Sequence, residues 1–203
     1  MNKKLLVFLP FLLILAGAFV SCEEVEEEGK YANWQERNQV YIDSIKSLVG
    51  NNYVATEEQA LAIPVGEMFA IQIGNSSTLD NPQYIYCKKI KSNTEGTRPL
   101  YTQSTDVFYY GTVITGESFE GNFKGYSAAD QSFSGDKNPT VFDAPKRFTV
   151  TGWIWTDPIQ FMREGERWML YVPWECGYGS SGSGSIPGYS VLGFDLQVEK
   201  VIQ

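Results

Sequence analysis

The chain has 203 residues, of which 16 are basic and 24 are acidic, and its formal net charge is −8 at pH 7. It contains no histidine, which excludes Ser-His-Asp and Cys-His catalysis and histidine ligation of a metal. The acidic balance argues against nucleic acid as a partner, because proteins bind a phosphate backbone through clustered Lys and Arg side chains.

The first 21 residues have the pattern of a secretory signal. Lys3 and Lys4 give a positive start, residues 5–15 are apolar, and small residues precede Cys22. The apolar run contains a proline and glutamates follow it at once, so we expect a cleaved signal rather than a transmembrane anchor. Removal of the two lysines would change the net charge from −8 to −10.

The end of this segment, AFVSC, resembles a bacterial lipobox, with Phe19 at the position where Leu is preferred. The resemblance implies that Cys22 is acylated and becomes the mature N-terminus, which would anchor the protein to a membrane of the cell envelope. A soluble secreted protein with an unpaired cysteine is the alternative.

An acidic run follows the cysteine. Five glutamates fall within residues 23–28, and such a run predicts a solvated tether, here over residues 22–32. An acidic stretch directly after a lipidated cysteine also resembles the surface-export signal of Bacteroidetes lipoproteins. The expected location is therefore the outer membrane, with exposure at the cell surface as a further expectation.

Residues Asn33–Val49 have the periodicity of an amphipathic helix. Asn33 is placed to cap it, and Glu36 follows three residues later, as in a capping box. The apolar face holds Trp34, Tyr41, Ile42, Ile45, Leu48 and Val49. We expect this face to pack on the protein's own domain, with a homodimer interface as the alternative. A shorter helix is predicted over Glu57–Leu61, and residues 33–83 are interpreted as an N-terminal helical appendage.

From Tyr84 onward the sequence alternates as strands do. Strands are predicted over residues 84–91, 106–114, 117–123, 140–142, 147–152, 166–173 and 189–202, with one short helix over 155–162. No βαβ unit is present, so the pattern predicts an α+β fold. We expect a mostly antiparallel sheet with one short internal helix, in a domain that spans residues 84–203.

The Gly-rich segment GYGSSGSGSIPGYS, residues 177–190, contains a formal G-x-G-x-x-G match. A dinucleotide site needs a helix after these glycines, whereas a strand is predicted here. None of the serines has a glycine two residues away on both sides, so a nucleophile elbow is excluded as well. The segment is interpreted as a polar, flexible loop. Cys87 and Cys176 lie among apolar residues and are interpreted as buried free thiols, with a disulfide as the alternative.

Two stretches of this half of the chain carry family motifs. The first, DVFYYGTVITGESFEG, resembles the pattern V-x-Y-x-G-x-L-x-x-G-x-x-F-D. The second supplies Met162, Gly165, Trp168, Pro173, Tyr178, Gly179, Ile186, Pro187, Leu192, Phe194 and Asp195. In this order the two stretches resemble the FK506-binding-protein (FKBP) type of peptidyl-prolyl isomerase over residues 84–203. The resemblance implies an FKBP-like fold, a curved antiparallel sheet around one short helix.

The resemblance also implies an activity, rotation about X-Pro bonds. The barrier is about 20 kcal/mol in water, and uncatalysed turnover takes tens of seconds or more. Rotation needs no acid, base, nucleophile or cofactor in principle, because a dry aromatic pocket can favour the twisted amide over the planar one. A barrier lower by about 5 kcal/mol gives nearly four decades of rate. The implied partners are proline-containing polypeptides, among them envelope or surface proteins that fold with this assistance.

The family's pocket residues can be carried over one by one. The resemblance implies Tyr109 as a wall with a polar tip, and Phe119 and Phe194 on the proline side. It implies Tyr178 as a hydrogen-bond donor to a substrate carbonyl, and Ile186 at the rim below the Gly-rich loop.

The pocket floor should be a tryptophan at the start of the short helix. Counting back from Met162 without gaps places it at Trp155, and in the same register Phe142 takes the place of another pocket aromatic. The alternative is Trp153, which follows a glycine as in the family pattern and requires a two-residue insertion.

Three features depart from the family pattern. Glu120 stands where Asp is usual, a long insert at residues 121–139 could cover the mouth of the pocket, and Gly188 replaces a proline. The extra methylene shifts a carboxylate by about an ångström, which can matter in a preorganised site. A catalytically weak or inactive FKBP-like module that binds peptides, as a chaperone or in a surface complex, is therefore the alternative function. A third interpretation, a glycan- or nutrient-binding lipoprotein, would need its aromatic side chains on an open face.

Overall fold

A computed structural model describes residues 29–73, 82–150 and 156–202. The predicted signal, Cys22, most of the predicted tether, and both candidate floor residues, Trp153 and Trp155, lie outside the described residues. From Trp34 onward the chain forms one compact unit. Within the described ranges, no helix combines the length and the apolar content needed to cross a membrane.

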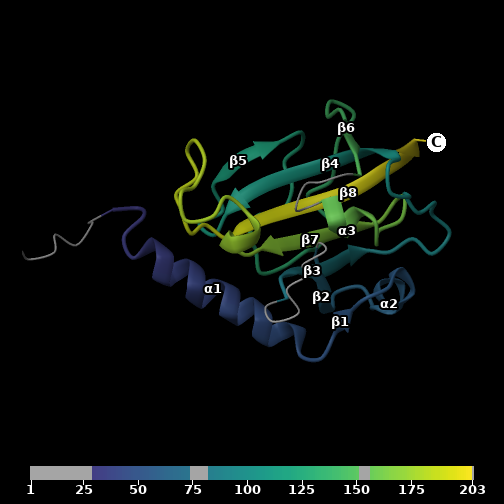
Figure 1. The fold of residues 1–203 in the computed structure, drawn as a ribbon. Coiled ribbons are helices and arrows are strands. Elements are labelled where there is room, and N and C mark those ends of the chain that lie inside the picture. The colour runs from purple at the N-terminus through teal and green to yellow at the C-terminus, as the bar shows by residue number, and fades with distance from the viewer. Residues whose placement is uncertain (1–28, 74–81, 151–155, 203) are drawn as a thin grey trace, which may run out of the picture. The chain divides into compact units, whose positions relative to one another are not determined.

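The compact unit consists of strands and a few helices (Figure 1). Its elements are α1 (Trp34–Val49), β1 (Tyr53–Val54), α2 (Glu57–Ala62), β2 (Met68–Gln72), β3 (Tyr84–Lys91), β4 (Ser104–Val113), β5 (Ser118–Gly121), β6 (Lys146–Thr149), α3 (Thr156–Ile159), β7 (Arg167–Val172), the 3-10 helix η1 (Trp174–Cys176) and β8 (Leu192–Ile202). The fold is α+β, as predicted.

The described strands form one eight-stranded sheet. Its order is β1-β2-β3-β7-β8-β4-β5, and β6 also pairs with β4. All pairs are antiparallel except the short β1–β2 pair. The strands β1 and β2 were not predicted: residues 33–83 hold two strands as well as two helices, and β2 continues the sheet from β3. The strand predicted over 140–142 is wrong, because these residues lie in a turn.

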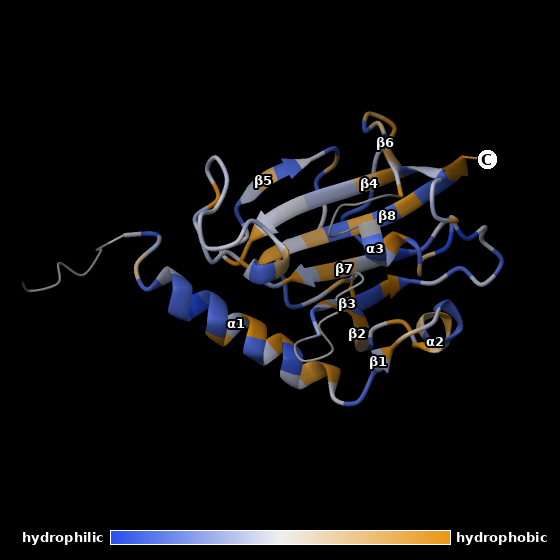
Figure 2. Cartoon of the chain, viewed as in Figure 1, coloured by the Kyte–Doolittle hydropathy of each residue, from blue (hydrophilic) through white to orange (hydrophobic). Residues whose placement is uncertain are grey.

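The side chains of the sheet point alternately to two faces, as strand geometry requires. The first face is apolar and buried, and its members include Phe69, Cys87, Trp168, Leu170, Phe194 and Leu196, which pair across neighbouring strands. The second face carries Met68, Ala70, Tyr86, Met169, Tyr171 and Asp195. In Figure 2 the strands show the resulting change of hydropathy from residue to residue.

Helix α1 packs on the second face of the sheet, which confirms that it packs on its own domain. Ile42, Ile45 and Val49 share one apolar cluster with side chains of β2, β3 and β7. The predicted face was wrong at Leu48, which is 64% exposed, and it missed Asn38, which is fully buried. A capping box is present at the start of α2, between Thr56 and Gln59, and the one expected at the start of α1 stays a prediction.

The insert at residues 121–139 also packs on the second face, opposite to Phe194. Its Tyr126 and Ala128 belong to the same cluster as α1, and the Tyr41 hydroxyl of α1 donates to the Ala128 carbonyl at 2.7 Å. The approach is close, since a Cβ added at Gly125 would lie 2.5 Å from Asp195 Oδ2. The described contacts of the insert therefore lie behind the sheet, whereas the sequence analysis expected it at the mouth of the pocket.

A buried ion pair fixes the insert to the sheet. Arg167 of β7 binds both carboxylate oxygens of Asp195 on β8, with Nε to Oδ1 at 2.7 Å, and both side chains are almost fully buried. The pair reaches the insert on both sides: Arg167 Nη2 donates to the Lys137 carbonyl at 2.6 Å, and the Tyr126 N–H donates to Asp195 at 2.7 Å. Burial raises the pKa of Asp195, and the guanidinium opposes this rise.

We expect Asp195→Ala to lower the free energy of unfolding by about 3–5 kcal/mol, because it leaves the Arg167 charge buried without its partner. The measurement is the urea midpoint followed by circular dichroism. The matched control is Asp106→Ala, which removes a carboxylate paired with the exposed Arg147 and should shift the midpoint far less. Equal shifts in the two variants would contradict the importance of the buried pair.

Three tyrosines lie behind the sheet, and because of them we expect the folded state to lose stability at alkaline pH. Burial raises the pKa values of Tyr41, Tyr86 and Tyr171 above the usual value. A group whose pKa is raised in the folded state contributes stability that is complete below its unfolded pKa, about 10 for tyrosine, and is lost as pH rises above it. Absorbance at 295 nm should therefore show a class of tyrosines that ionise only when circular dichroism shows unfolding. If all tyrosines ionise near pH 10 while circular dichroism shows that the protein is still folded, the prediction is wrong. The urea-unfolded chain gives the reference titration.

Candidate active site

Two phenylalanines form an aromatic wall on the first face of the sheet. Phe119 of β5 and Phe194 of β8 meet edge to face, with ring centroids 5.6 Å apart and an interplanar angle of 90°. Gly111 on β4 leaves room for both rings, because a Cβ there would lie 2.8 Å from Phe119 and 2.9 Å from Phe194. The structure thus brings together the two side chains that were expected to line the proline side.

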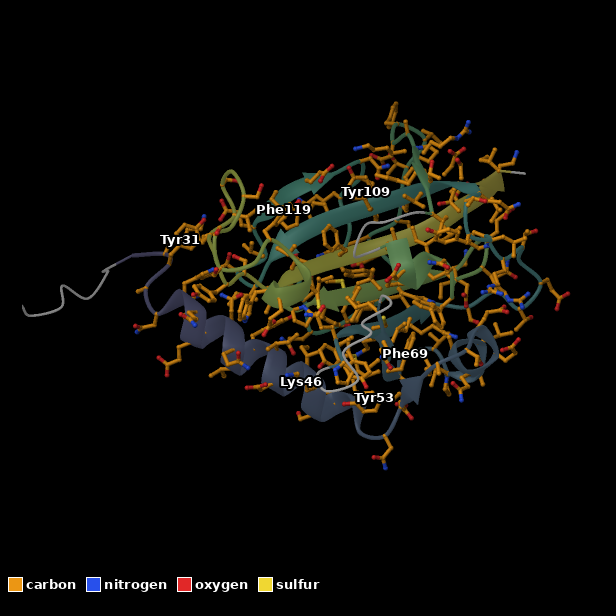
Figure 3. The ribbon with its side chains drawn as sticks, viewed as in Figure 1. Tyr31, Lys46, Tyr53, Phe69, Tyr109 and Phe119 are labelled. Atoms are coloured by element: carbon orange, nitrogen blue, oxygen red, sulfur yellow. The ribbon has the colours of Figure 1, made fainter. Side chains whose placement is uncertain are left out.

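Tyr109 of β4 lies next along the same face, and its hydroxyl donates to Glu120 Oε1 at 2.6 Å (Figure 3). Its backbone N–H donates to the Asn122 side chain at 2.8 Å, which in turn donates to the Val107 carbonyl at 2.9 Å. Burial, and then the hydrogen bond to Glu120, raise the pKa of Tyr109. The phenol therefore stays protonated at neutral pH and presents its donor to the carboxylate.

Glu120 compensates for its departure from the family pattern in one respect. Its longer side chain still reaches the Tyr109 hydroxyl, and it also forms an ion pair with Lys146 of β6 at 3.4 Å. The Lys146 ammonium lies 3.3 Å from the Tyr109 hydroxyl and over the rings of Tyr109 and Phe148, at 5.6 and 5.1 Å from their centroids. A polar triad of hydroxyl, carboxylate and ammonium therefore borders the aromatic wall.

Phe148 is the aromatic neighbour of Tyr109, with ring centroids 5.6 Å apart. The sequence analysis assigned this kind of position to Phe142, which is wrong: Phe142 is 95% exposed. Counting without gaps failed because the chain turns over residues 140–145 and re-enters the sheet only at Lys146. The signal that could have found Phe148 is its place in the alternating stretch RFTV.

The Gly-rich loop, residues 177–190, is closed by its own hydrogen bonds. Ser183 and Ile186 exchange two backbone hydrogen bonds, at 3.0 and 2.9 Å, and the Tyr189 N–H donates to the Gly179 carbonyl at 2.9 Å. Ile186 is buried, whereas Tyr178 is 39% exposed. The roles implied for these two residues stay predictions.

Helix α1 holds the end of this loop. The Trp34 indole N–H donates to the Ser190 hydroxyl at 3.0 Å, and that hydroxyl donates to the Pro187 carbonyl at 2.6 Å. Asn38 accepts from the Val191 N–H at 2.7 Å and donates to the Trp34 carbonyl at 2.7 Å. A helix far upstream in sequence thereby fixes the segment that joins the loop to β8.

Loss of the indole bond should loosen the loop without unfolding the protein. In Trp34→Phe the amide of Val191 should exchange its hydrogen about two- to tenfold faster, because one buried hydrogen bond contributes about 0.5–1.5 kcal/mol. Hydrogen exchange followed by mass spectrometry or NMR measures this. The control is Leu48→Ser on the exposed side of the same helix. Unchanged exchange in the Phe variant would show that the loop does not depend on α1.

The described residues include no group of three or more His, Cys, Asp or Glu arranged for a metal ion. Cys87 and Cys176 are buried free thiols, as predicted. Burial, with a smaller effect of Glu175, raises the pKa of Cys176 to about 12, so the thiol is protonated at neutral pH.

Parts of the chain are similar to known proteins. Macrophage infectivity potentiator of Trypanosoma cruzi is 30% identical over 136 residues, which are 66% of this chain and 62% of that protein. FKBP-type peptidyl-prolyl cis-trans isomerase FkpA of Aeromonas hydrophila is 30% identical over 125 residues, 62% of this chain and 40% of that protein. The crystal structure of a peptidyl-prolyl cis-trans isomerase from Pseudomonas syringae pv. tomato gives a TM-score of 0.47 at 19% identity, covering 82% of this chain and 96% of that one.

The chain spans about half the length of the curated relatives it matches. A family model described as FKBP-type peptidyl-prolyl cis-trans isomerase matches residues 96–199, which contain β4 to β7, β8 up to Glu199 and the whole described aromatic wall. The chain therefore belongs to the FKBP-type peptidyl-prolyl cis-trans isomerase family.

Proposed function

We propose that the protein is a peptidyl-prolyl cis-trans isomerase that acts on proline-containing polypeptides. The observation that carries the proposal is the bond from the Tyr109 hydroxyl to Glu120 beside the edge-to-face pair of Phe119 and Phe194, within the residues that match the family. A proline ring fits an apolar aromatic wall, and the neighbouring polar groups can orient the peptide that carries it.

The chemistry suits this set of side chains. Rotation about the X-Pro bond breaks no covalent bond and needs no proton transfer, so a site without histidine suffices. An apolar wall favours the twisted amide, whose carbonyl has lost resonance and part of its dipole, over the planar amide that water solvates well. The hydroxyl, carboxylate and ammonium of the Tyr109–Glu120–Lys146 triad are paired with one another beside this wall.

We further propose that the protein works at the cell envelope and is held there by acyl chains on Cys22. The lipobox-like AFVSC motif and the acidic run after it support this proposal. Envelope or surface proteins whose folding waits for proline isomerisation are then the expected clients.

A module that binds peptides without turnover is the second candidate, and Glu120 in place of Asp is the observation that favours it. A glycan-binding surface has less support. The aromatic residues in question lie within the part of the chain that matches the peptidyl-prolyl isomerase family, and no described feature points to a sugar ligand.

The decisive experiment is an isomerase assay of the mature chain with Cys22→Ser, on short Xaa-Pro peptides and without a coupling protease. Phe194→Ala and Tyr178→Ala should each lower kcat/KM about ten- to a hundredfold, a loss of about 1.4–2.7 kcal/mol of transition-state stabilisation. Tyr101→Ala, at a tyrosine that is 63% exposed, is the control and should retain full activity.

A folded protein that gives no acceleration would overturn the isomerase proposal and favour the binding module. Glu120→Asp is then the informative variant. If Glu120→Asp is active, the extra methylene of Glu120 is what disables the site. If Glu120→Asp is also inactive, the cause of the inactivity lies elsewhere in the chain.

A further inference from the structure

Two neighbouring apolar side chains stand free of the fold in the turn before β6. Val141 is 94% exposed and Phe142 is 95% exposed, the highest values among the large exposed hydrophobic side chains of the described residues. Figure 2 shows this turn projecting above β6, with hydrophobic colour at its end. We call these two residues the apolar tip. Solvent exposure of a whole phenylalanine is unfavourable, so the exposure itself needs an explanation.

Hydrogen bonds between Thr140 and Asp143 fix the turn that carries the apolar tip. Asp143 Oδ2 accepts from both the backbone N–H and the hydroxyl of Thr140, at 2.6 and 2.8 Å, and the Asp143 N–H donates back to the Thr140 carbonyl at 3.0 Å. Pro139 and Pro145 flank the turn and restrict its backbone further. A preformed turn loses little conformational entropy when it binds, which favours association over collapse onto the protein's own surface.

The apolar tip lies close to the candidate pocket. Phe142 lies four positions before Lys146 in the sequence, which limits the distance between their Cα atoms to about 14 Å. Lys146 in turn contacts the Tyr109 hydroxyl and Glu120. An extended peptide gains about 3.3 Å per residue, so a polypeptide with its proline at the aromatic wall can reach the apolar tip about four to six residues away. A tetrapeptide has no residue four to six positions away from its proline.

We propose that the apolar tip is a second contact for the client polypeptide, binding an apolar side chain several residues away from the proline in the pocket. This inference rests on the proposed function and adds a substrate class to it: extended or unfolded chains that carry an apolar residue near a proline. We assign the apolar tip to the client polypeptide because it lies beside the aromatic wall. The apolar tip is continuous in sequence with β6, whose Lys146 and Phe148 border that wall.

The test compares the mature Cys22→Ser chain with the same chain carrying Val141→Ser and Phe142→Ser. On a blocked tetrapeptide, kcat/KM should agree within about twofold. On a ten-residue peptide with a phenylalanine five residues from the proline, kcat/KM should fall about tenfold, through KM, because burial of one such side chain contributes about a factor of ten in affinity. Phe142→Leu, which keeps an apolar side chain, should restore most of the loss.

The matched control is Val40→Ser with Leu48→Ser, which removes two exposed apolar side chains from α1, behind the sheet. It should leave both substrates unaffected. An equal loss in this control would overturn the proposal, and so would a loss on the tetrapeptide or no loss on the long peptide. A dimer of the parent chain that the tip variant abolishes would show that a second copy covers the apolar tip, which also overturns it.

The two proposals can fail separately. If the parent chain does not accelerate isomerisation, the proposed function fails, and the apolar tip is then tested by the affinity for a fluorescent, reduced and alkylated polypeptide that contains proline. A tenfold weaker Kd in the tip variant supports the second contact in that case, and an unchanged Kd overturns it.

Discussion

The arrangement of this protein depends on the buried pair of Arg167 and Asp195. A carboxylate and a guanidinium in the interior are tolerable only when their remaining hydrogen-bonding groups are also satisfied, and here the insert at residues 121–139 supplies those partners. The pair therefore does more than join β7 to β8. It makes the insert a required layer of the structure, because removal of the insert would leave both charges without their additional partners in a dry environment.

Helix α1 and the insert together convert the back of the sheet into a second core. The helix precedes the residues that match the family, yet it contacts β2, β3 and β7 and the end of the Gly-rich loop. The loop is therefore held by its internal hydrogen bonds and by contacts with a helix that is far away in the sequence. The aromatic wall lies on the other face of the sheet, so that the surface proposed to bind proline is separate from the surface that α1 and the insert support.

Local sequence patterns predicted most of the strands after Tyr84 and the pair of Phe119 and Phe194, because motif order and alternation are local properties. The local patterns failed where the position of a residue depends on residues that are far away in the sequence. Strand β2 is buried on both faces and shows no alternation, so it was missed. Phe142 was placed by counting across a turn whose length the pattern does not fix. The burial of Asn38 depends on Val191, more than 150 residues away, and no pattern within the helix signals such a partner.

Two consecutive residues of β8 serve opposite faces of the sheet: Phe194 belongs to the aromatic wall, and Asp195 forms the buried ion pair behind the sheet. Loss or gain of a single residue upstream of them would exchange the two faces, putting a charge into the aromatic wall and a phenyl ring beside a buried guanidinium. Substitution of either residue damages one face, whereas a shift of register damages both at once. The segment of β8 that precedes Phe194 therefore tolerates a change of side chain more readily than a change of length, whereas beyond Asp195 the β4–β8 pair already contains a register shift.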